Sequence, residues 1–303
     1  MYQRQTRVNT DYKPYKDLKS LQNTEPPTDT KFNWRGYSRF MNDRFTIVNK
    51  DKEEVPFKQQ PAQDDFLYHM SQYYQIIILK ARKMGFSSTS LGVAAGKFLT
   101  GRNENCVSMS FDADARVKQL ARAKQFIKSY ERATGTKIPF KYNRQNAMVF
   151  EGLDPDTGET WTNTLRVGTA KSSSFGRGDD ITFLHLTEVA FCDDIPTLLA
   201  GVGEALIRGS HMIFETTANG FNSYKQFWDD TIRNKTGFGA LFYTPDWEYD
   251  AEYLAAREKR LGRLYMQEYP QNPLQAFLTS GLPYFDTEAL ERYITMIKEP
   301  LNV

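Results

Sequence analysis

The sequence lacks three features, and each absence removes a class of protein. No apolar run approaches the ~18 residues that a membrane-spanning helix needs. The first residues, MYQRQTRVNTDYKPYK, contain no apolar segment, so they are not a secretory signal. Of the two cysteines, Cys106 and Cys192, each lies in or beside an apolar run, and no paired spacing indicates zinc or a disulfide framework. We therefore expect a protein of the cytoplasm with reduced thiols.

Net charge is also nearly absent. The 303 residues carry 39 basic and 37 acidic side chains, a balance of +2, so any nucleic-acid footprint must be local. The local candidate is an expected helix between Asp112, a suitable N-cap, and Gly135, a suitable stop. Its basic residues are Arg116, Lys118, Arg122, Lys124, Lys128 and Arg132. Such a pattern marks a solvated helix face more often than a surface that tracks DNA.

The order of apolar segments predicts an α/β fold. Continuous apolar runs end near residues 81, 111, 188 and 218 and alternate with helical patterns, which is typical of a mainly parallel sheet covered on both faces. Residues 1–44 read as a polar arm with one short helix near its end, and a hairpin and a helix starting at Pro61 follow. From Asp250 the pattern is mostly helical. We expect an arm at 1–44, a core at 45–249 and a helical region at 250–303.

One strand-to-helix turn, ILKARKMGFSST, has parts of a phosphate-binding loop. Gly85 permits close approach of the main chain, and Ser87 and Ser88 supply hydroxyls in the first helical turn. The lysine of the standard motif is replaced by Phe86. Three earlier cations can substitute for it: Lys80, Arg82 and Lys83. Alone, this stretch is explained equally well as an ordinary turn.

Two further strand ends carry polar groups. ITFLHLTE ends in Glu188, the position of an acid that polarises water in nucleotide hydrolases, although Thr187 stands where an aspartate is usual. MIFETTANG ends in hydroxyls and an amide that could sense a γ-phosphate. Because ligands of open α/β sheets gather at the carboxyl ends of strands, the three segments together favour a nucleotide site.

These motifs, with PFKQQPAQ upstream, resemble the ATPase domain of the large terminase subunits of tailed bacteriophages. The resemblance spans roughly residues 45–285 and implies an additional-strand P-loop ATPase fold, with ATP and Mg²⁺ as cofactors. It implies a contact of Gln63 with adenine and a P-loop at residues 80–87, with Ser87 on the magnesium side. The expected metal-side residues are Ser87, Thr187 and Glu188, and Phe86 and Ser88 are expected to line the nucleotide.

The same resemblance assigns catalysis, coupling and partners. Glu188 maps to the catalytic acid, and Arg177 maps to an arginine that stabilises the transition state, in some members from a neighbouring subunit. The coupling residues are Thr216, Thr217 and Asn219. The implied partners are double-stranded DNA, the portal protein of the procapsid, the small terminase subunit and further copies in a ring, pentameric on the portal. The expected location is the host cell cytoplasm during viral assembly.

The sequence departs from the family pattern at three places. Phe86 replaces the P-loop lysine, and some family members resemble it in having an aromatic residue there and a lysine at the head of the loop, which favours Lys80. Thr187 replaces the aspartate, so magnesium is expected through Ser87 and water, with Glu188 or Asp180 behind. Third, the family continues into an RNase H-like nuclease, whereas this sequence stops at Val303, so no nuclease activity is expected from it.

Three functions remain open at this point: a DNA-translocating packaging ATPase, a nucleotide-binding subunit that has lost hydrolysis and acts as a scaffold or regulator, and an unrelated P-loop enzyme such as a helicase. The ETTANG strand and the Arg177–Gly178 pair favour a terminase over an unrelated enzyme. ATP turnover distinguishes the first function from the second.

Overall fold

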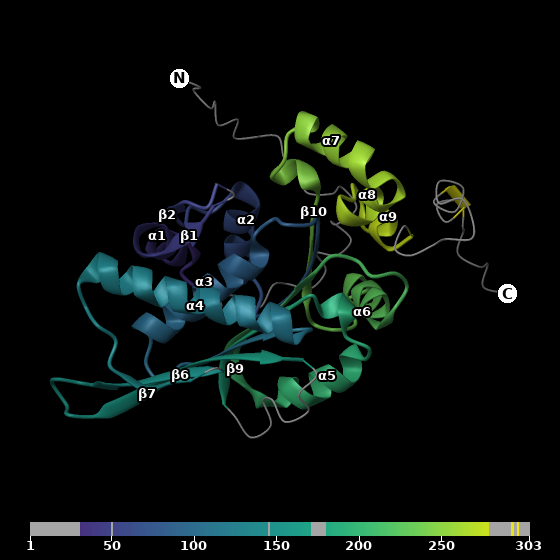
Figure 1. The fold of residues 1–303 in the computed structure, drawn as a ribbon. Helices are drawn as coiled ribbons and strands as arrows, with labels where there is room; N and C mark the ends of the chain where they lie inside the picture. The colour runs from purple at the N-terminus through teal and green to yellow at the C-terminus, as the bar shows by residue number, and fades with distance from the viewer. Residues whose placement is uncertain are drawn as a thin grey trace.

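An eight-stranded sheet forms the centre of the computed structural model, which describes residues 31–49, 51–144, 146–170, 180–278, 292, 293 and 296 (Figure 1). The strand order is β10-β3-β9-β8-β4-β7-β6-β5. From β10 to β7 neighbouring strands are parallel, and β7, β6 and β5 pair antiparallel. The strands are β3 (Gln75–Lys80), β4 (Asn105–Ser110), β5 (Phe140–Asn143), β6 (Ala147–Leu153), β7 (Thr160–Thr169), β8 (Ile181–Thr187), β9 (Leu206–Thr216) and β10 (Gly239–Tyr243). The predicted mainly parallel α/β fold is confirmed.

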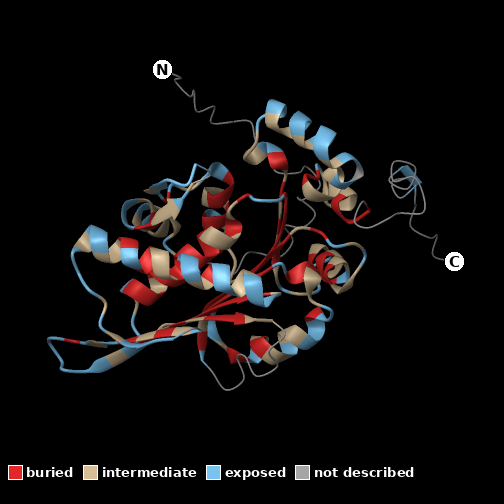
Figure 2. Ribbon diagram, viewed as in Figure 1, coloured by how far each residue is buried: buried red, intermediate tan, exposed pale blue. Residues whose placement is uncertain are grey.

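Helices cover both faces of this sheet (Figures 1 and 2). One face carries α1 (Trp34–Arg44), α2 (Pro61–Met70), α3 (Phe86–Thr100) and α4 (Ala113–Thr134); the other carries α5 (Ile195–Val202) and α6 (Ser223–Ile232). Strand β3 shows why both faces are buried: Ile76 and Ile78 enter one apolar cluster, whereas Ile77 and Leu79 enter the other. A strand buried on both sides needs the continuous apolar run seen in the sequence.

Local signals place the helix ends. The Asp112 carboxylate accepts a hydrogen bond from the N–H of Ala115 at the start of α4, and Gly135 ends the helix in the left-handed conformation, with φ of 71°. Pro61 is the first residue of α2. These three predicted boundaries are confirmed.

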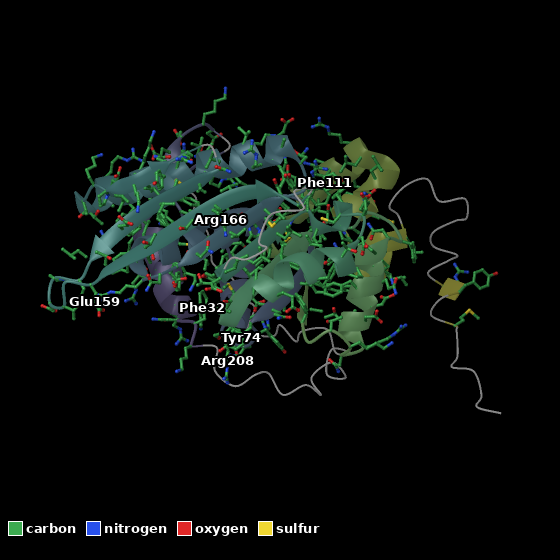
Figure 3. The ribbon with its side chains drawn as sticks, turned by 90° about the horizontal axis from the view of Figure 1, so that it is seen from below. Phe32, Tyr74, Phe111, Glu159, Arg166 and Arg208 are labelled. Carbon is green, nitrogen blue, oxygen red and sulfur yellow. The ribbon has the colours of Figure 1, made fainter. Side chains whose placement is uncertain are left out.

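The short helix predicted near the end of the arm is α1. Its Met41 is fully buried, so this helix packs into the main core. The expected hairpin follows as β1 (Thr46–Val48) and β2 (Glu54–Pro56). Phe32 and Tyr74, labelled in Figure 3, both contact the ring of His211, with centroids 5.3 Å and 5.4 Å away. Phe32, two residues before α1, therefore also packs on the sheet.

Beyond β10 the described chain is helical, as predicted, with α7 (Ala251–Leu261), α8 (Tyr265–Glu268) and α9 (Pro273–Leu278). The division at residues 44 and 249 stays a prediction. None of the helices in the described ranges has the length and apolar character needed to cross a membrane. Cys106 and Cys192 form no disulfide there, and burial raises the pKa of the Cys106 thiol to about 12.

Candidate active site

Three parallel strands bring the predicted site residues to one edge of the sheet. Strand β3 ends at Lys80, β8 ends at Thr187 and β9 ends at Thr216, and all three point the same way. Strand β9 lies between β3 and β8. One strand thus separates the strand before the P-loop from the strand before Glu188, the predicted catalytic acid, which is the order that the additional-strand fold predicts.

The P-loop turns sharply between β3 and α3. Lys83 and Gly85 both have positive φ, 61° and 77°, and α3 begins directly afterwards at Phe86. The helix start directs main-chain N–H groups toward the loop, an arrangement that binds phosphate. A Cβ atom at Gly85 would lie 2.3 Å from Nε2 of Gln63, so this position needs glycine both for its φ and for its space.

Gln63 supports this loop from α2. Its Nε2 donates to the carbonyl of Met84 at 2.9 Å, and its Oε1 accepts from the N–H of Gln60 at 3.2 Å. The side chain is 5% exposed. Its amide therefore holds the P-loop main chain, and the contact with adenine stays a prediction.

The ring of Phe86 packs in the core. Its side chain is fully buried, with ring centroids 5.7 Å from Phe66 and 4.7 Å from Tyr243. It anchors the start of α3 in the core. A contact of Phe86 with nucleotide, which its main chain could make, stays a prediction.

The three candidate cations have different surroundings. Lys80 is 8% exposed, and its Nζ lies 3.2 Å from Oε2 of Glu215. Arg82 pairs with Glu268 of α8 at 2.9 Å, and the hydrogen bond and charge of Glu268 raise the pKa of the guanidinium. The Lys83 side chain is exposed. Lys80 is therefore the cation held inside the site, whereas Arg82 ties the loop to the C-terminal helices.

Arg122 also reaches the P-loop, although the sequence placed it only on a basic helix. Its guanidinium donates to the hydroxyl of Ser88 in the first turn of α3. Desolvation lowers the pKa of Arg122. One exposed basic residue of α4 thus also contacts the first turn of α3.

Glu215 is the site residue that the sequence interpretation missed. This carboxylate on β9 is 1% exposed, accepts a hydrogen bond from Ser87 Oγ at 2.6 Å and forms the ion pair with Lys80. His185 Nε2 lies 3.5 Å from it, and His185 Nδ1 lies 2.9 Å from Ser108 Oγ. The available signal was an acid inside an apolar strand, one residue before its end.

The Glu215 carboxyl stays ionised despite its burial. Burial alone would raise its pKa, but the charge of Lys80, together with His185 and the Ser87 hydroxyl, holds the pKa well below its ordinary value. Thr187 lies beside it, 6% exposed, with Oγ1 3.2 Å from Ser87 Oγ. Two strands therefore supply polar partners for the Ser87 hydroxyl.

Glu188 follows β8 in the left-handed conformation, with φ of 58° and ψ of 37°. This backbone costs a non-glycine residue about 1–2 kcal/mol. It is held by the Glu188 N–H, which donates to the carbonyl of Glu215 at 2.8 Å. The side chain is exposed to solvent, and partial desolvation, with the charges of Glu215 and Asp112, raises its pKa. A strained backbone and a carboxylate with a raised pKa, both at the end of a strand, are typical of residues in acid–base catalysis.

The predicted coupling residues contact the turn that follows Glu188. The hydroxyl of Thr216 accepts from the N–H of Ala190 at 3.2 Å, and Asn219 Nδ2 donates to the carbonyl of Ala190 at 3.3 Å. Thr217, which lies between Thr216 and Asn219 in the sequence, is partly buried. The end of β9 thus holds the turn that follows Glu188.

Arg177 lies outside the described residues, so its role stays a prediction. Asp180 is described and exposed at the opposite end of β8 from Glu188, and its carbonyl accepts from Asn105 Nδ2 at 3.1 Å. That position removes Asp180 from the expected magnesium environment. Within the described ranges, no group of three or more His, Cys, Asp or Glu side chains could hold a metal ion. A cation here would need phosphate oxygens as well, which is how Mg²⁺ is usually bound with nucleotides.

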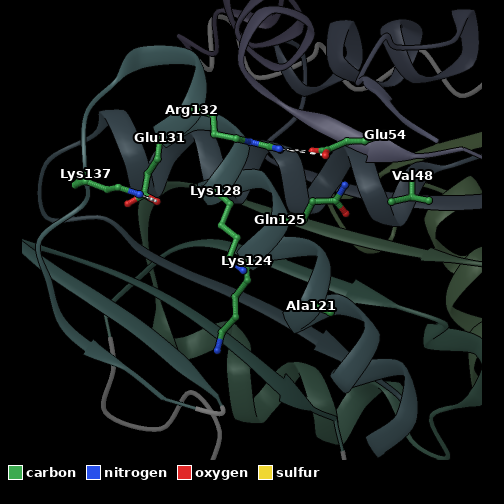
Figure 4. Close-up of a pocket in the computed structure, with 9 residues that line it drawn as sticks. All are labelled: Val48, Glu54, Ala121, Lys124, Gln125, Lys128, Glu131, Arg132 and Lys137. Carbon is green, nitrogen blue, oxygen red and sulfur yellow. Dashed lines mark hydrogen bonds and ion pairs between the residues drawn. The ribbon is translucent and has the colours of Figure 1, made fainter. Parts of the chain in front are cut away.

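A concave region lies between α4 and the β1–β2 hairpin (Figure 4). It has a volume of about 580 Å³, and its lining includes Lys124, Lys128, Lys137 and Arg132. Arg132 pairs with Glu54, so part of this basic surface is neutralised. The contact of α4 with DNA stays a prediction.

Comparison with known proteins supports the fold. No family model and no curated protein sequence matches the chain. Among solved structures, it is similar to the large terminase ATPase domain of Thermus phage P74-26, with a TM-score of 0.55 and 17% identity over 71% of this chain and 92% of that one. A mutant of that domain gives a TM-score of 0.56 and 16% identity over 71% and 93% of the two chains.

The large terminase of bacteriophage HK97 is also similar, with a TM-score of 0.53 and 14% identity. The match covers 88% of this chain but 52% of the HK97 protein, so the chain spans about half the length of that relative. At these identities the comparison establishes a shared fold. The resemblance inferred from the motifs is confirmed at that level.

Proposed function

We propose that the protein is the ATPase part of a viral genome-packaging motor, which couples ATP hydrolysis to movement of double-stranded DNA into a procapsid. The carrying observation is the contact of β9 with both halves of the candidate site. Glu215 joins the P-loop residues Lys80 and Ser87, and the same strand end holds the turn after Glu188. A motor needs such a link, because events at the phosphate must move other parts of the protein.

ATP binding is assigned to the P-loop. Main-chain N–H groups at the start of α3 meet the phosphates, and Lys80 supplies positive charge after leaving Glu215. The side chains that would hold Mg²⁺ are those around the Ser87 hydroxyl, including Thr187. When bound, the ion neutralises charge on the phosphate oxygens.

Hydrolysis is assigned to Glu188. Its carboxylate is exposed at the end of β8, where it can orient a water molecule or accept its proton. The raised pKa makes this carboxylate a stronger base. Because Ala190 is bonded to Thr216 and Asn219, a shift of Glu188 on hydrolysis is transmitted to β9 and the segment after it.

The assembly rests on the resemblance to terminases. Arg177 completes the site of a neighbouring copy in a ring on the portal protein, and the small terminase subunit assists with DNA. The work takes place in the host cell cytoplasm. A ring that completes its sites between subunits explains how hydrolysis would be coordinated around DNA.

Steady-state ATP turnover, with and without double-stranded DNA, tests this function. We expect turnover in the wild type, faster with DNA, and a loss of ~10²–10⁴-fold in Glu188→Gln. Glu204→Gln is the matched control, because Glu204 is an exposed acid of the short 3-10 helix η3 (Gly203–Ala205) before β9. Nucleotide binding without turnover would instead support a scaffold or regulatory subunit, and turnover insensitive to DNA would support an unrelated P-loop enzyme.

A further inference from the structure

The Ser87 hydroxyl has an ionised partner even though the expected aspartate is absent. A serine hydroxyl has one proton and two lone pairs, so it can face a cation only when its proton is directed elsewhere. Here the proton goes to Oε1 of Glu215 at 2.6 Å. Thr187, which stands at the aspartate position, offers only a hydroxyl, 3.2 Å from Ser87 Oγ. The function of the missing acid is thus available from a different residue.

The position of this residue is set by strand pairing. Thr187 and Glu215 are paired in register on the parallel strands β8 and β9, so their side chains emerge side by side. Strand β9 is one strand nearer to β3 and its P-loop than β8. An acid at position 215 on β9 therefore lies level with position 187 on β8, at the same edge of the sheet.

We propose that Glu215 replaces the absent aspartate of β8 as the carboxylate of the Mg²⁺–nucleotide site, and that it orients the Ser87 hydroxyl toward the ion. The inference rests on the proposed ATP-binding function. It assigns to Glu215 a role that the motif pattern gives to residue 187.

Charge balance gives an independent reason. Oε2 of Glu215 lies 3.2 Å from Lys80 Nζ but accepts no hydrogen bond within the described part of the chain. When Lys80 turns to the phosphates, the carboxylate is left 1% exposed without its ion-pair partner. An uncompensated buried charge is costly, and a cation that arrives with the nucleotide removes that cost.

The alternative is that Glu215 contributes to stability alone. If Glu215 served only to neutralise Lys80, its contact with Ser87 would have no consequence for Mg²⁺. The two oxygens instead serve different partners, with Oε1 on Ser87 and Oε2 beside Lys80. This difference can be measured, because only the proposed role links Glu215 to the metal dependence of nucleotide binding.

The test is the affinity for ATPγS, measured by titration calorimetry with Mg²⁺ and with EDTA. The wild type should bind more tightly with Mg²⁺, and Glu215→Gln should lose about 10–100-fold of that gain. The double variant Thr187→Asp/Glu215→Gln restores an acid at the usual position and should recover most of it. Glu268→Gln is the matched control, because Glu268 pairs with Arg82 of the same loop and not with Ser87; it should keep the full Mg²⁺ effect.

Thermal melting of each variant shows whether it is folded. If Glu215→Gln fails to fold, the Mg²⁺ effect on ATPγS affinity is measured in Glu215→Asp instead. That variant keeps the negative charge, but its side chain is shorter by one methylene group, so the carboxylate lies farther from Ser87. A wild-type Mg²⁺ effect in the folded Gln variant, or in the Asp variant when the Gln variant does not fold, would overturn the role of Glu215 and leave the proposed function intact. Absence of ATPγS binding by the wild type itself would overturn the proposed function and this inference together.

Discussion

Replacement of Lys80 by alanine should damage both stability and catalysis, and the two effects can be separated. Lys80 and Glu215 form an ion pair at 3.2 Å with 10% and 1% of their side chains exposed. Removal of one partner leaves a buried carboxylate without its cation, which typically costs 3–5 kcal/mol. Ser87 still donates to Glu215, so we expect the lower end, about 3 kcal/mol of the unfolding free energy.

Urea unfolding at pH 7.5 measures this cost. The double variant Lys80→Ala/Glu215→Gln removes both charges and should recover most of the lost stability, yet its ATP turnover should remain absent because the phosphate cation is missing. Lys83→Ala is the matched control, since Lys83 is an exposed cation of the same loop; its stability should stay within about 0.5 kcal/mol of the wild type. Equal stability of Lys80→Ala and the wild type would refute the reasoning.

The pH dependence provides a second check. In the wild type the pKa of Glu215 is lowered from its ordinary 4.5, so its stabilising contribution is fully present above pH 4.5 and is lost as pH falls below that value. Without Lys80 the main cause that lowers the pKa is gone, and burial, which raises it, gains weight. The stability gap between wild type and Lys80→Ala should therefore narrow as pH falls from the pKa of Glu215 in the folded variant toward its lower pKa in the folded wild type. A gap that is constant with pH would contradict this account.

Three further variants test other parts of the site. Turnover should fall as pH drops through the pKa of Glu188, which lies above its ordinary 4.5, and Glu188→Gln should abolish this acid limb while ATP still binds; an unchanged pH profile would move the role elsewhere. Arg177→Ala should lose ~10³-fold of the turnover reached at high protein concentration, and mixing it with Glu188→Gln should restore some activity; a flat concentration profile without rescue would exclude a role in trans. Gly85→Ala should weaken ATPγS binding in calorimetry, because φ of 77° costs alanine about 1–2 kcal/mol, and added Gln63→Ala should not restore it; wild-type affinity would refute this.

The sequence predicted the elements of the fold well because their signals are local. Strand β3 is apolar throughout and buried on both faces, and α4 begins and ends at the capping residues that its sequence shows. The strand order was accessible only through the motif resemblance. Nothing in the residues of β9 alone states that it lies between β3 and β8, because pairing depends on the packing of the whole sheet.

The site was predicted less completely because two of its features depend on contacts distant in the chain. Glu215 lies 128 residues from Ser87, and an acid in an apolar strand gives no sign of the hydroxyl that it will meet. The motif position of Phe86 also gave no sign that its ring would pack with Phe66 and Tyr243. The orientation of the Phe86 ring follows from its burial in the core, which depends on residues distant in the sequence.

A crystal structure with ATPγS and Mg²⁺ tests the central claim most directly. The account predicts the triphosphate at the start of α3, with Lys80 turned from Glu215 to the phosphates, Ser87 and Glu215 on the side of the ion, and Glu188 facing the γ-phosphate. Nucleotide bound elsewhere, or bound at α3 with Lys80 still paired to Glu215 and another cation on the phosphates, would contradict it.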